Sequence, residues 1–293
     1  MSLDEKKSPD EISQTVSDAS EPNHLETLDK LEILPQMLQE GILFAGAGSA
    51  LLLQAAFPGI RNRTHDHNEG SSSSDSSNLA KDLGDALQAN LSYIACLVFG
   101  TSDEKKTLLD LSNQGKPPLK GSENFSSHRP TQLWVAATLY ATATDFYQRI
   151  YGRVNYRTAE KAYAEFTVMM HAMGLPPGTW PENRQLFWQY WDDQIEQLTV
   201  TADAHRFAQD LLQRTDYPGW VSVTKPVLRA MTIEMLPPRI REAYGLKSTF
   251  GTRSLYRTTM GFSVAVYPAL PGSTRGYPLR YYLEELRKNM NVV

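Results

Sequence analysis

The sequence predicts a mostly α-helical protein, folded as a single domain of about ten helices. Three observations support this fold class. Apolar residues recur at steps of three and four along residues 133–150 and again along 159–173, which is the spacing of one helix face. Strand-like alternation is scarce, and only residues 256–268 are compatible with either a helix or a strand. Hydrophobic residues make up 41% of the chain, enough for a substantial core.

Two polar segments stand out from the expected helical domain. Residues 1–27 are acidic, Ser-rich and nearly free of aromatic side chains, so we expect a disordered tail there. This start lacks the basic region and apolar run of a signal peptide. Residues 68–78, NEGSSSSDSSN, predict a flexible surface insertion. The helical domain is then expected to span residues 28–293.

The most apolar run, residues 42–57, predicts a buried core helix. It is shorter than the about 20 residues that span a bilayer, and Gln54 and two glycines interrupt it. We therefore expect no transmembrane segment. Within the run, the segment AGAGSAL resembles part of a dinucleotide-binding loop, but Leu51 replaces the third glycine and no strand precedes it. Small residues there are better explained by two helices that pack closely.

Helix ends are indicated by residues that cap helices. Ser102, followed by two acidic residues, predicts one helix start, and Thr201 predicts another. Gly174, followed closely by two prolines, predicts the end of the helix that contains residues 159–173.

Charge and cysteine content exclude some classes of protein. The formal net charge is −4, and acidic and basic residues nearly balance, so no basic stripe indicates a nucleic-acid partner. Cys96 is the only cysteine, which excludes an intramolecular disulfide and fits a reducing compartment. It lies in SYIACLVFG, which predicts a core position. We expect an intracellular, cytoplasmic protein, and leave peripheral membrane contact open.

Several titratable residues have both a functional and a structural interpretation. His65 and His67 in a polar loop could bind a metal with a third ligand, but solvated loop histidines are more common. Glu165 lies among apolar residues in AYAEFTV and needs a partner there; structural pairing is favoured over catalysis. The aromatic-rich residues 179–193 could line an apolar pocket, but packing between helices is favoured.

Several segments of the chain, taken in order, resemble a known protein family. They are LLLQAAFPGI, SYIACLVFGTSDEK, LWVAATLYATATDFYQRIYG, AYAEF, GLPPGTWPE and MLPPRIREAYGL. Their order and spacing are similar to those of the MpaB-type oxygenases and the rubber oxygenases (latex-clearing proteins), over about residues 30–290. The short soluble fungal members are the most similar. The resemblance implies a helical catalytic domain that binds haem b, and an oxidoreductase that acts on a small apolar substrate such as a secondary metabolite.

The residues that handle haem in that family differ in this chain. Relatives carry an Arg and, four residues later, a Thr on the helix before SYIACLVFG, and rubber oxygenases carry a Lys just before the Thr. By resemblance these positions are Ala86, Asn90 and Ala89. The histidine taken as the haem ligand falls on Lys116, and a lysine ammonium has no lone pair for iron until it loses its proton. If haem binds, His128 is the first replacement ligand to consider.

This degenerate haem site leaves three functions open. The first is an oxygenase of the family. The second is a haem-independent cyclase, isomerase or dehydratase on the same scaffold, with Glu165, His67, His128 and Lys116 as candidate polar groups. The third is a non-catalytic binding protein. His67 falls where relatives carry a histidine, so it is a candidate catalytic residue together with Glu165. The resemblance favours an enzyme.

Overall fold

A computed structural model describes residues 24–60, 75–113, 129–213 and 219–290, and every regular element within these ranges is a helix. Ten of the described α-helices have nine or more residues, which confirms the predicted fold class and number. The elements of the first half are α2 (His24–Asp29), α3 (Ile33–Leu38), η1 (Gly41–Gly46), α4 (Ala47–Ala55), α6 (Asp75–Phe99), α7 (Ser102–Asn113) and α9 (Arg129–Tyr151). Those of the second half are α10 (Tyr156–Ala172), α11 (Arg184–Gln197), α12 (Ala202–Gln213), α13 (Gly219–Met235), α14 (Pro238–Ala243), α15 (Phe250–Val266), η2 (Tyr267–Ala269), α16 (Gly272–Arg275) and α17 (Tyr277–Met290).

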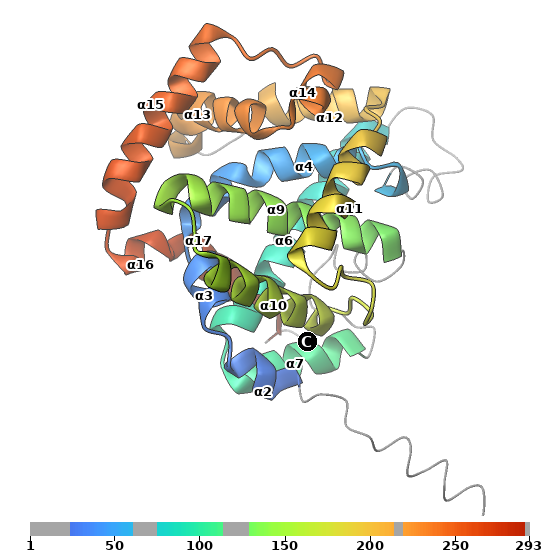
Figure 1. Cartoon of the computed structure of the whole chain (residues 1–293), viewed down its shortest axis with the longest axis vertical. Coiled ribbons are helices and arrows are strands. Elements are labelled where there is room, and N and C mark those ends of the chain that lie inside the picture. Colours follow the sequence, from blue (N-terminus) through green and yellow to red (C-terminus); the bar gives the residue numbers. More distant parts are fainter. Residues whose placement is uncertain (1–23, 61–74, 114–128, 214–218, 291–293) are drawn as a thin grey trace, which may run out of the picture.

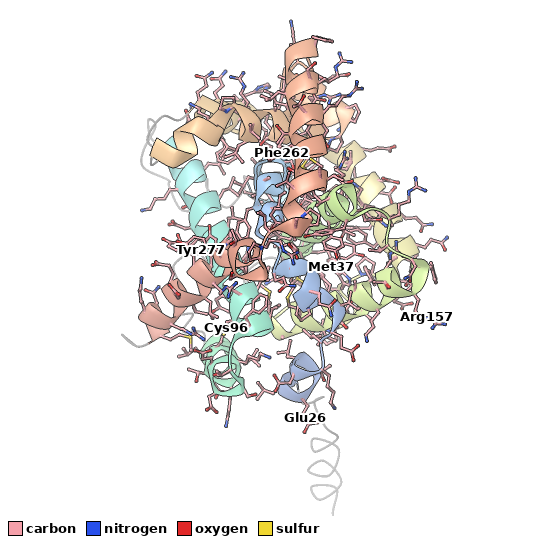
Figure 2. All side chains as sticks on the ribbon, turned by 90° about the vertical axis from the view of Figure 1, so that its left-hand side faces the viewer. Glu26, Met37, Cys96, Arg157, Phe262 and Tyr277 are labelled. Carbon is pink, nitrogen blue, oxygen red and sulfur yellow. The ribbon has the colours of Figure 1, made fainter. Side chains whose placement is uncertain are left out.

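Helices α4 and α9 run side by side through the middle of the molecule, and the other helices surround them (Figure 1). Helices α13 and α15 pack together at one end, and α2 and α7 lie together at the other. Helix α6 contacts both α12 and the C-terminal helix α17. The face turned to the viewer in Figure 2 carries two exposed aromatic residues, Phe262 on α15 and Tyr277 at the start of α17.

The apolar run predicted as a buried helix folds in two parts. A 3₁₀ turn, η1, comes first, and α4 follows with residues 49–55 all buried. A Cβ atom on Gly48 would lie 2.2 Å from the Thr232 hydroxyl oxygen of α13, well inside contact distance. The expected close approach of two helices at these small residues is therefore confirmed, and the partner helix is α13.

The C-terminal end of α4 is held by donors from distant parts of the chain. The last carbonyls of a helix have no partner within the helix itself. The Tyr244 hydroxyl donates to the carbonyl oxygen of Leu52 at 2.7 Å, and the Trp134 indole donates to that of Leu53 at 3.1 Å. These bonds fix α4 between α9 and the residue that follows α14.

Helix ends follow the predicted caps, with one shift. Helix α7 begins at Ser102 as predicted, but its cap is Thr101. The Thr101 hydroxyl accepts the Glu104 N–H at 3.2 Å, while the Glu104 carboxylate accepts the Thr101 N–H at 2.9 Å, which is a capping box. The Thr201 hydroxyl accepts a backbone N–H of α12 at 3.3 Å. Gly174 follows α10 with a φ of 92°, a left-handed conformation that favours glycine.

One ambiguous segment is settled by the structure, and two predicted segments overlap helices. Residues 256–268, compatible with either a helix or a strand in the sequence, belong to α15 and η2. Helix α2 includes residues 24–27 of the predicted tail, and the first turn of α6 includes residues 75–78 of the predicted Ser-rich insertion. The remainder of both segments lies outside the described residues.

Candidate functional site

A small cavity, which we name the central cavity, lies against α6 in the middle of the domain. Its volume is about 70 Å³. Residues from seven elements, α3, η1, α4, α6, α9, α10 and α17, form its wall. All of them are apolar except for one threonine: Leu38, Leu43, Phe44, Ala47, Ala50, Leu87, Leu91, Ile94, Leu139, Thr142, Ala143, Phe166 and Leu279. Such a wall favours an apolar molecule over a polar one.

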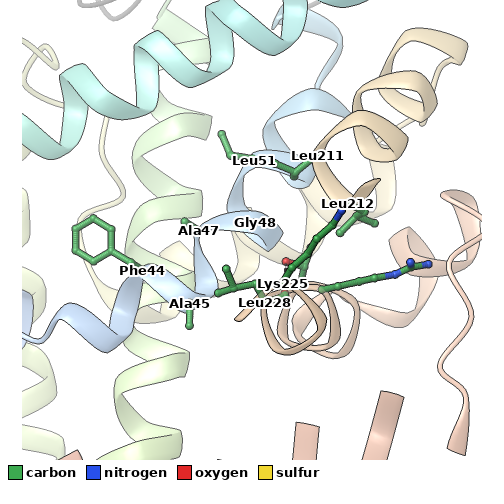
Figure 3. A pocket seen from close by; sticks show the side chains of 11 residues that line it. Phe44, Ala45, Ala47, Gly48, Leu51, Leu211, Leu212, Lys225 and Leu228 are labelled. Carbon is green, nitrogen blue, oxygen red and sulfur yellow. Dashed lines mark hydrogen bonds between the residues drawn. The ribbon is translucent and has the colours of Figure 1, made fainter. Parts of the chain in front are cut away.

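A second and larger cavity, the side cavity, lies between η1, α4, α12 and α13 (Figure 3). Its volume is about 200 Å³. Most of its lining is apolar, and two cationic side chains of α13 complete it: Phe44, Ala45, Ala47, Gly48, Leu51, Leu211, Leu212, Lys225, Leu228, Arg229 and Thr232. The side cavity therefore combines carbon surface with positive charge, which the central cavity does not.

Phe44 and Ala47 line both cavities, so the junction of η1 and α4 separates them. The Phe44 ring stacks on Tyr282 of α17, with ring centres 5.5 Å apart and planes 3° from parallel. The C-terminal helix thus helps to position the wall between the two cavities.

Asn90, predicted to be a cofactor-binding residue, lies on α6 next to the central cavity. Its side chain is buried, as is that of Ala89. Leu87 and Ile94 precede and follow it by three and four residues, the spacing of one helix face, and both line the cavity. Asn90 is not itself among the lining residues. Its cofactor role stays a prediction.

Glu165, predicted as a candidate catalytic residue, caps the N-terminus of α3. One carboxylate oxygen accepts the Glu32 N–H at 3.0 Å, and the other accepts the N–H groups of Ile33 at 2.9 Å and Leu34 at 2.7 Å. The first N–H groups of a helix have no partner within the helix, and a carboxylate suits the positive end of its dipole. The structural pairing considered from the sequence is therefore present, and Glu165 lines neither cavity. Its catalytic role stays a prediction.

The other predicted site residues lie outside the described residues. They are His67, Lys116 and His128, together with His65 of the possible metal loop. Of the five predicted site residues, the structure thus describes Asn90 on α6 and Glu165 on α10, and it does not bring their side chains together in one cavity.

The described residues around the central cavity do not fit haem. Its wall offers carbon and one hydroxyl, with no imidazole, thiol, thioether or phenol to bind iron and no cation to pair with a propionate. Its volume is also far below the about 300–1,000 Å³ of pockets that hold larger ligands. We therefore assign no reaction step to haem.

The aromatic-rich segment packs between helices, as favoured from the sequence. The buried rings of Trp180 and Phe187 lie 5.3 Å apart, and Phe187 lies 4.8 Å from Tyr140 of α9. Burial raises the pKa of Tyr140 and of the neighbouring Tyr163, so both phenols stay protonated at neutral pH. This cluster fixes α9, α10 and α11 relative to one another.

Two polar features were missed in the sequence. Lys225 and Arg229 lie four residues apart in an otherwise apolar stretch of α13, a pattern that could have indicated a shared helix face. Glu40, which is 3% exposed, pairs with Arg275 at 2.6 Å across 235 positions, and Arg275 also donates to the Tyr151 hydroxyl at 2.9 Å. No local pattern connects residues so far apart.

Among the residues that the structure describes, no group of three or more His, Cys, Asp and Glu side chains could hold a metal ion. None of the described helices is both long enough and apolar enough to cross a membrane.

The fold and its cavities define an all-α domain with two largely carbon-lined cavities around one buried helix. Residues 34–265 match the family described as the ER-bound oxygenase mpaB/B' and rubber oxygenase, catalytic domain. Because the match covers most of the chain, the protein belongs to this family. The family predicted from the sequence segments is thereby confirmed.

Two curated relatives match a part of the chain. They are the uncharacterised proteins Rv2237 of Mycobacterium tuberculosis and Mb2261 of Mycobacterium bovis, each 26% identical over 157 residues. The aligned part is 52% of this chain and 60% of each relative, so the chain spans less than two thirds of their length. No solved structure matches the chain.

Proposed function

We propose that this protein is an oxidoreductase that acts on a small apolar molecule held in the central cavity. The observation that carries the proposal is the match of residues 34–265 to a catalytic domain of oxygenases. The carbon wall of the central cavity supports an apolar substrate. That the chain is of the short fungal type, and that its substrate comes from secondary metabolism, are parts of the same proposal.

Binding in the central cavity requires side chains to move, because about 70 Å³ is too small for a metabolite. Phe44 is the best placed to move, since it separates the two cavities and is only partly buried. A rotation of its ring toward the side cavity would enlarge the central one. Phe44→Ala should then strengthen the binding of an apolar probe, whereas Tyr156→Ala, at an exposed aromatic on α10, should not change it.

An absorbance spectrum of the purified full chain, with iron quantified, tests the redox part of the proposal. A Soret band with about one iron per chain, together with oxygen uptake, supports an oxygenase. His128→Ala and Lys116→Ala then identify the ligand, because loss of that ligand shifts or bleaches the band. His205→Ala is the matched control, since His205 lies on α12 against Tyr244. A protein that stays colourless after haem reconstitution and takes up no oxygen would overturn an oxygenase function.

The second candidate function is a haem-independent one on the same scaffold, either a cyclase, isomerase or dehydratase, or non-catalytic binding. The departures of Ala86, Ala89 and Asn90 from the family residues favour it, as does the wall beside them, which is apolar except for Thr142. Deletion of the gene followed by mass spectrometry of metabolites separates these possibilities. A changed product in a strain whose protein is colourless supports a haem-independent enzyme, and an unchanged profile contradicts it.

A further inference from the structure

The side cavity places two cations beside an apolar floor. Among the described residues that line it, Lys225 and Arg229 are the only charged ones, and none carries a carboxylate. They lie on successive turns of α13 on one helix face. Two like charges at this spacing destabilise a helix unless an opposite charge lies near them. The arrangement therefore favours an anion at this cavity.

The surroundings of the two cations differ. The Lys225 ammonium donates to the carbonyl oxygen of Gln213 at 2.7 Å, at the C-terminal end of α12, which holds it next to the cavity. Arg229 is exposed and forms no ion pair with any acidic residue in the described part of the chain. Its guanidinium thus remains available to a ligand, and a guanidinium binds a carboxylate through two parallel hydrogen bonds.

The floor of the side cavity offers a ligand almost only carbon. Leu51 of α4 and Leu211 and Leu212 of α12 supply most of it. Thr232 carries the one hydroxyl among the described lining residues, and this hydroxyl already donates to the carbonyl oxygen of Leu228 at 2.9 Å. A polar molecule would lose hydration on this floor without gaining hydrogen bonds, whereas an alkyl chain would gain from burial.

We propose that the side cavity binds an amphipathic anion, with an alkyl chain on the leucine floor and a carboxylate between Lys225 and Arg229. The volume of about 200 Å³ lies below the range of about 300–1,000 Å³ typical of larger ligands, which indicates a chain of medium length. This site does not depend on the proposed oxidoreductase function, because Lys225, Arg229 and the leucine floor all lie outside the wall of the central cavity.

The test is displacement of a fluorescent fatty-acid probe from the full-length protein by decanoate and by decanol. Decanoate should displace the probe at a concentration about ten-fold below that of decanol, the difference expected for one charge-assisted hydrogen bond. Arg229→Gln should remove this preference, and Lys225→Gln should weaken it. Arg253→Gln is the matched control, because Arg253 is an exposed cation on α15 away from the cavity.

Two further measurements separate the remaining outcomes. Ala45→Leu, which fills the side cavity without changing charge, should weaken decanoate and decanol alike while the thermal melt stays cooperative. Vesicles containing phosphatidic acid, used as the competitor in place of decanoate, show whether the anion comes from a lipid headgroup or from a free acid. Displacement of the probe by either anion supports the site if Arg229→Gln abolishes it. Equal displacement by decanoate and decanol, unchanged by Arg229→Gln, overturns the proposal. Any Soret band and oxygen uptake that the unmodified protein has should be unchanged in Arg229→Gln, so the two proposals fail independently.

Discussion

The Glu165 carboxylate on α10 accepts the backbone N–H of Leu34 at 2.7 Å and so joins residues 131 positions apart. The same carboxylate also accepts the N–H groups of Glu32 and Ile33. A single side chain therefore satisfies three donors at the start of α3, a helix that itself contributes Leu38 to the central cavity. In this way a residue outside the cavity helps to position one of its walls.

Replacement of Glu165 by Ala should strongly destabilise the fold. Three N–H groups, that of Glu32 and the first two of α3, would lose their acceptor in a partly to fully buried place. A lost hydrogen bond to a charged group costs about 1.5–3 kcal/mol. Because water can replace some of these hydrogen bonds, we expect Glu165→Ala to lose about 3 kcal/mol in the free energy of unfolding. Glu165→Gln keeps one acceptor oxygen and should lose about half as much. Urea denaturation measures both.

Glu160 on the same helix provides the control for Glu165. It pairs with Arg184 at 3.0 Å, and both side chains are partly exposed. Such pairs contribute about 0–1 kcal/mol, so Glu160→Ala should have only a small effect. A Glu165→Gln protein of unchanged stability that lacks activity would contradict the capping role and support the catalytic one.

Acid should weaken the contact between α7 and α17. The Arg287 guanidinium, which donates to Glu104 at 2.6 Å, lowers the pKa of that carboxyl below its ordinary value of 4.5. Because the folded-state pKa is the lower one, this pair stabilises the fold fully above about pH 5, and the contribution is lost as the pH falls through the folded-state pKa. Glu104→Gln should therefore show a shallower loss of stability between about pH 5 and pH 3.

A series of urea titrations over this pH range checks the acid prediction. Glu242→Gln is the control, because Glu242 is exposed and forms no ion pair with another described residue. If Glu104→Gln and the unmodified protein lost stability in parallel on acidification, the ion pair would not couple α7 to α17.

The helical fold was predictable because it is encoded locally. Residues 133–150 and 159–173 each carry an apolar face, and Gly174 ends the second helix by its backbone conformation. These signals lie within a few residues of one another, so they can be recognised in the sequence without knowledge of the tertiary structure. Thr101 was missed as a cap because Ser102 beside it is an equally suitable residue type.

The cavities were not predictable in the same way. The wall of the central cavity combines seven elements, and in the sequence its residues, mostly leucines and alanines, do not differ from other core residues. The partner of Glu165 is backbone N–H of α3, which no side-chain pattern encodes. The sequence could predict that Glu165 needs a partner, but only the tertiary structure shows which one.

Cys96 should be unreactive in the folded protein. Burial inside α6 raises the pKa of its thiol to about 12, and the thiolate is the reactive form. A thiol reagent at about pH 8 should therefore label the native protein very slowly and the denatured protein rapidly. The signal has one source, since the chain contains a single cysteine. Equal labelling rates in the two states would contradict the buried position.

Replacement of Gly48 by Ala should force α4 and α13 apart. The new Cβ would lie 2.2 Å from the Thr232 hydroxyl oxygen, and overpacking of this kind costs about 1–3 kcal/mol. Thr232→Ala in the same chain should restore part of that loss, because it removes the colliding atom. Gly84→Ala is the control, because Gly84 lies inside α6 with nothing within 4 Å of a new Cβ. This variant should gain about 0.5–1 kcal/mol in the free energy of unfolding. Thermal melts of the unmodified protein, of Gly48→Ala with and without Thr232→Ala, and of Gly84→Ala measure these changes. An unchanged stability of Gly48→Ala would show that the helices do not approach this closely.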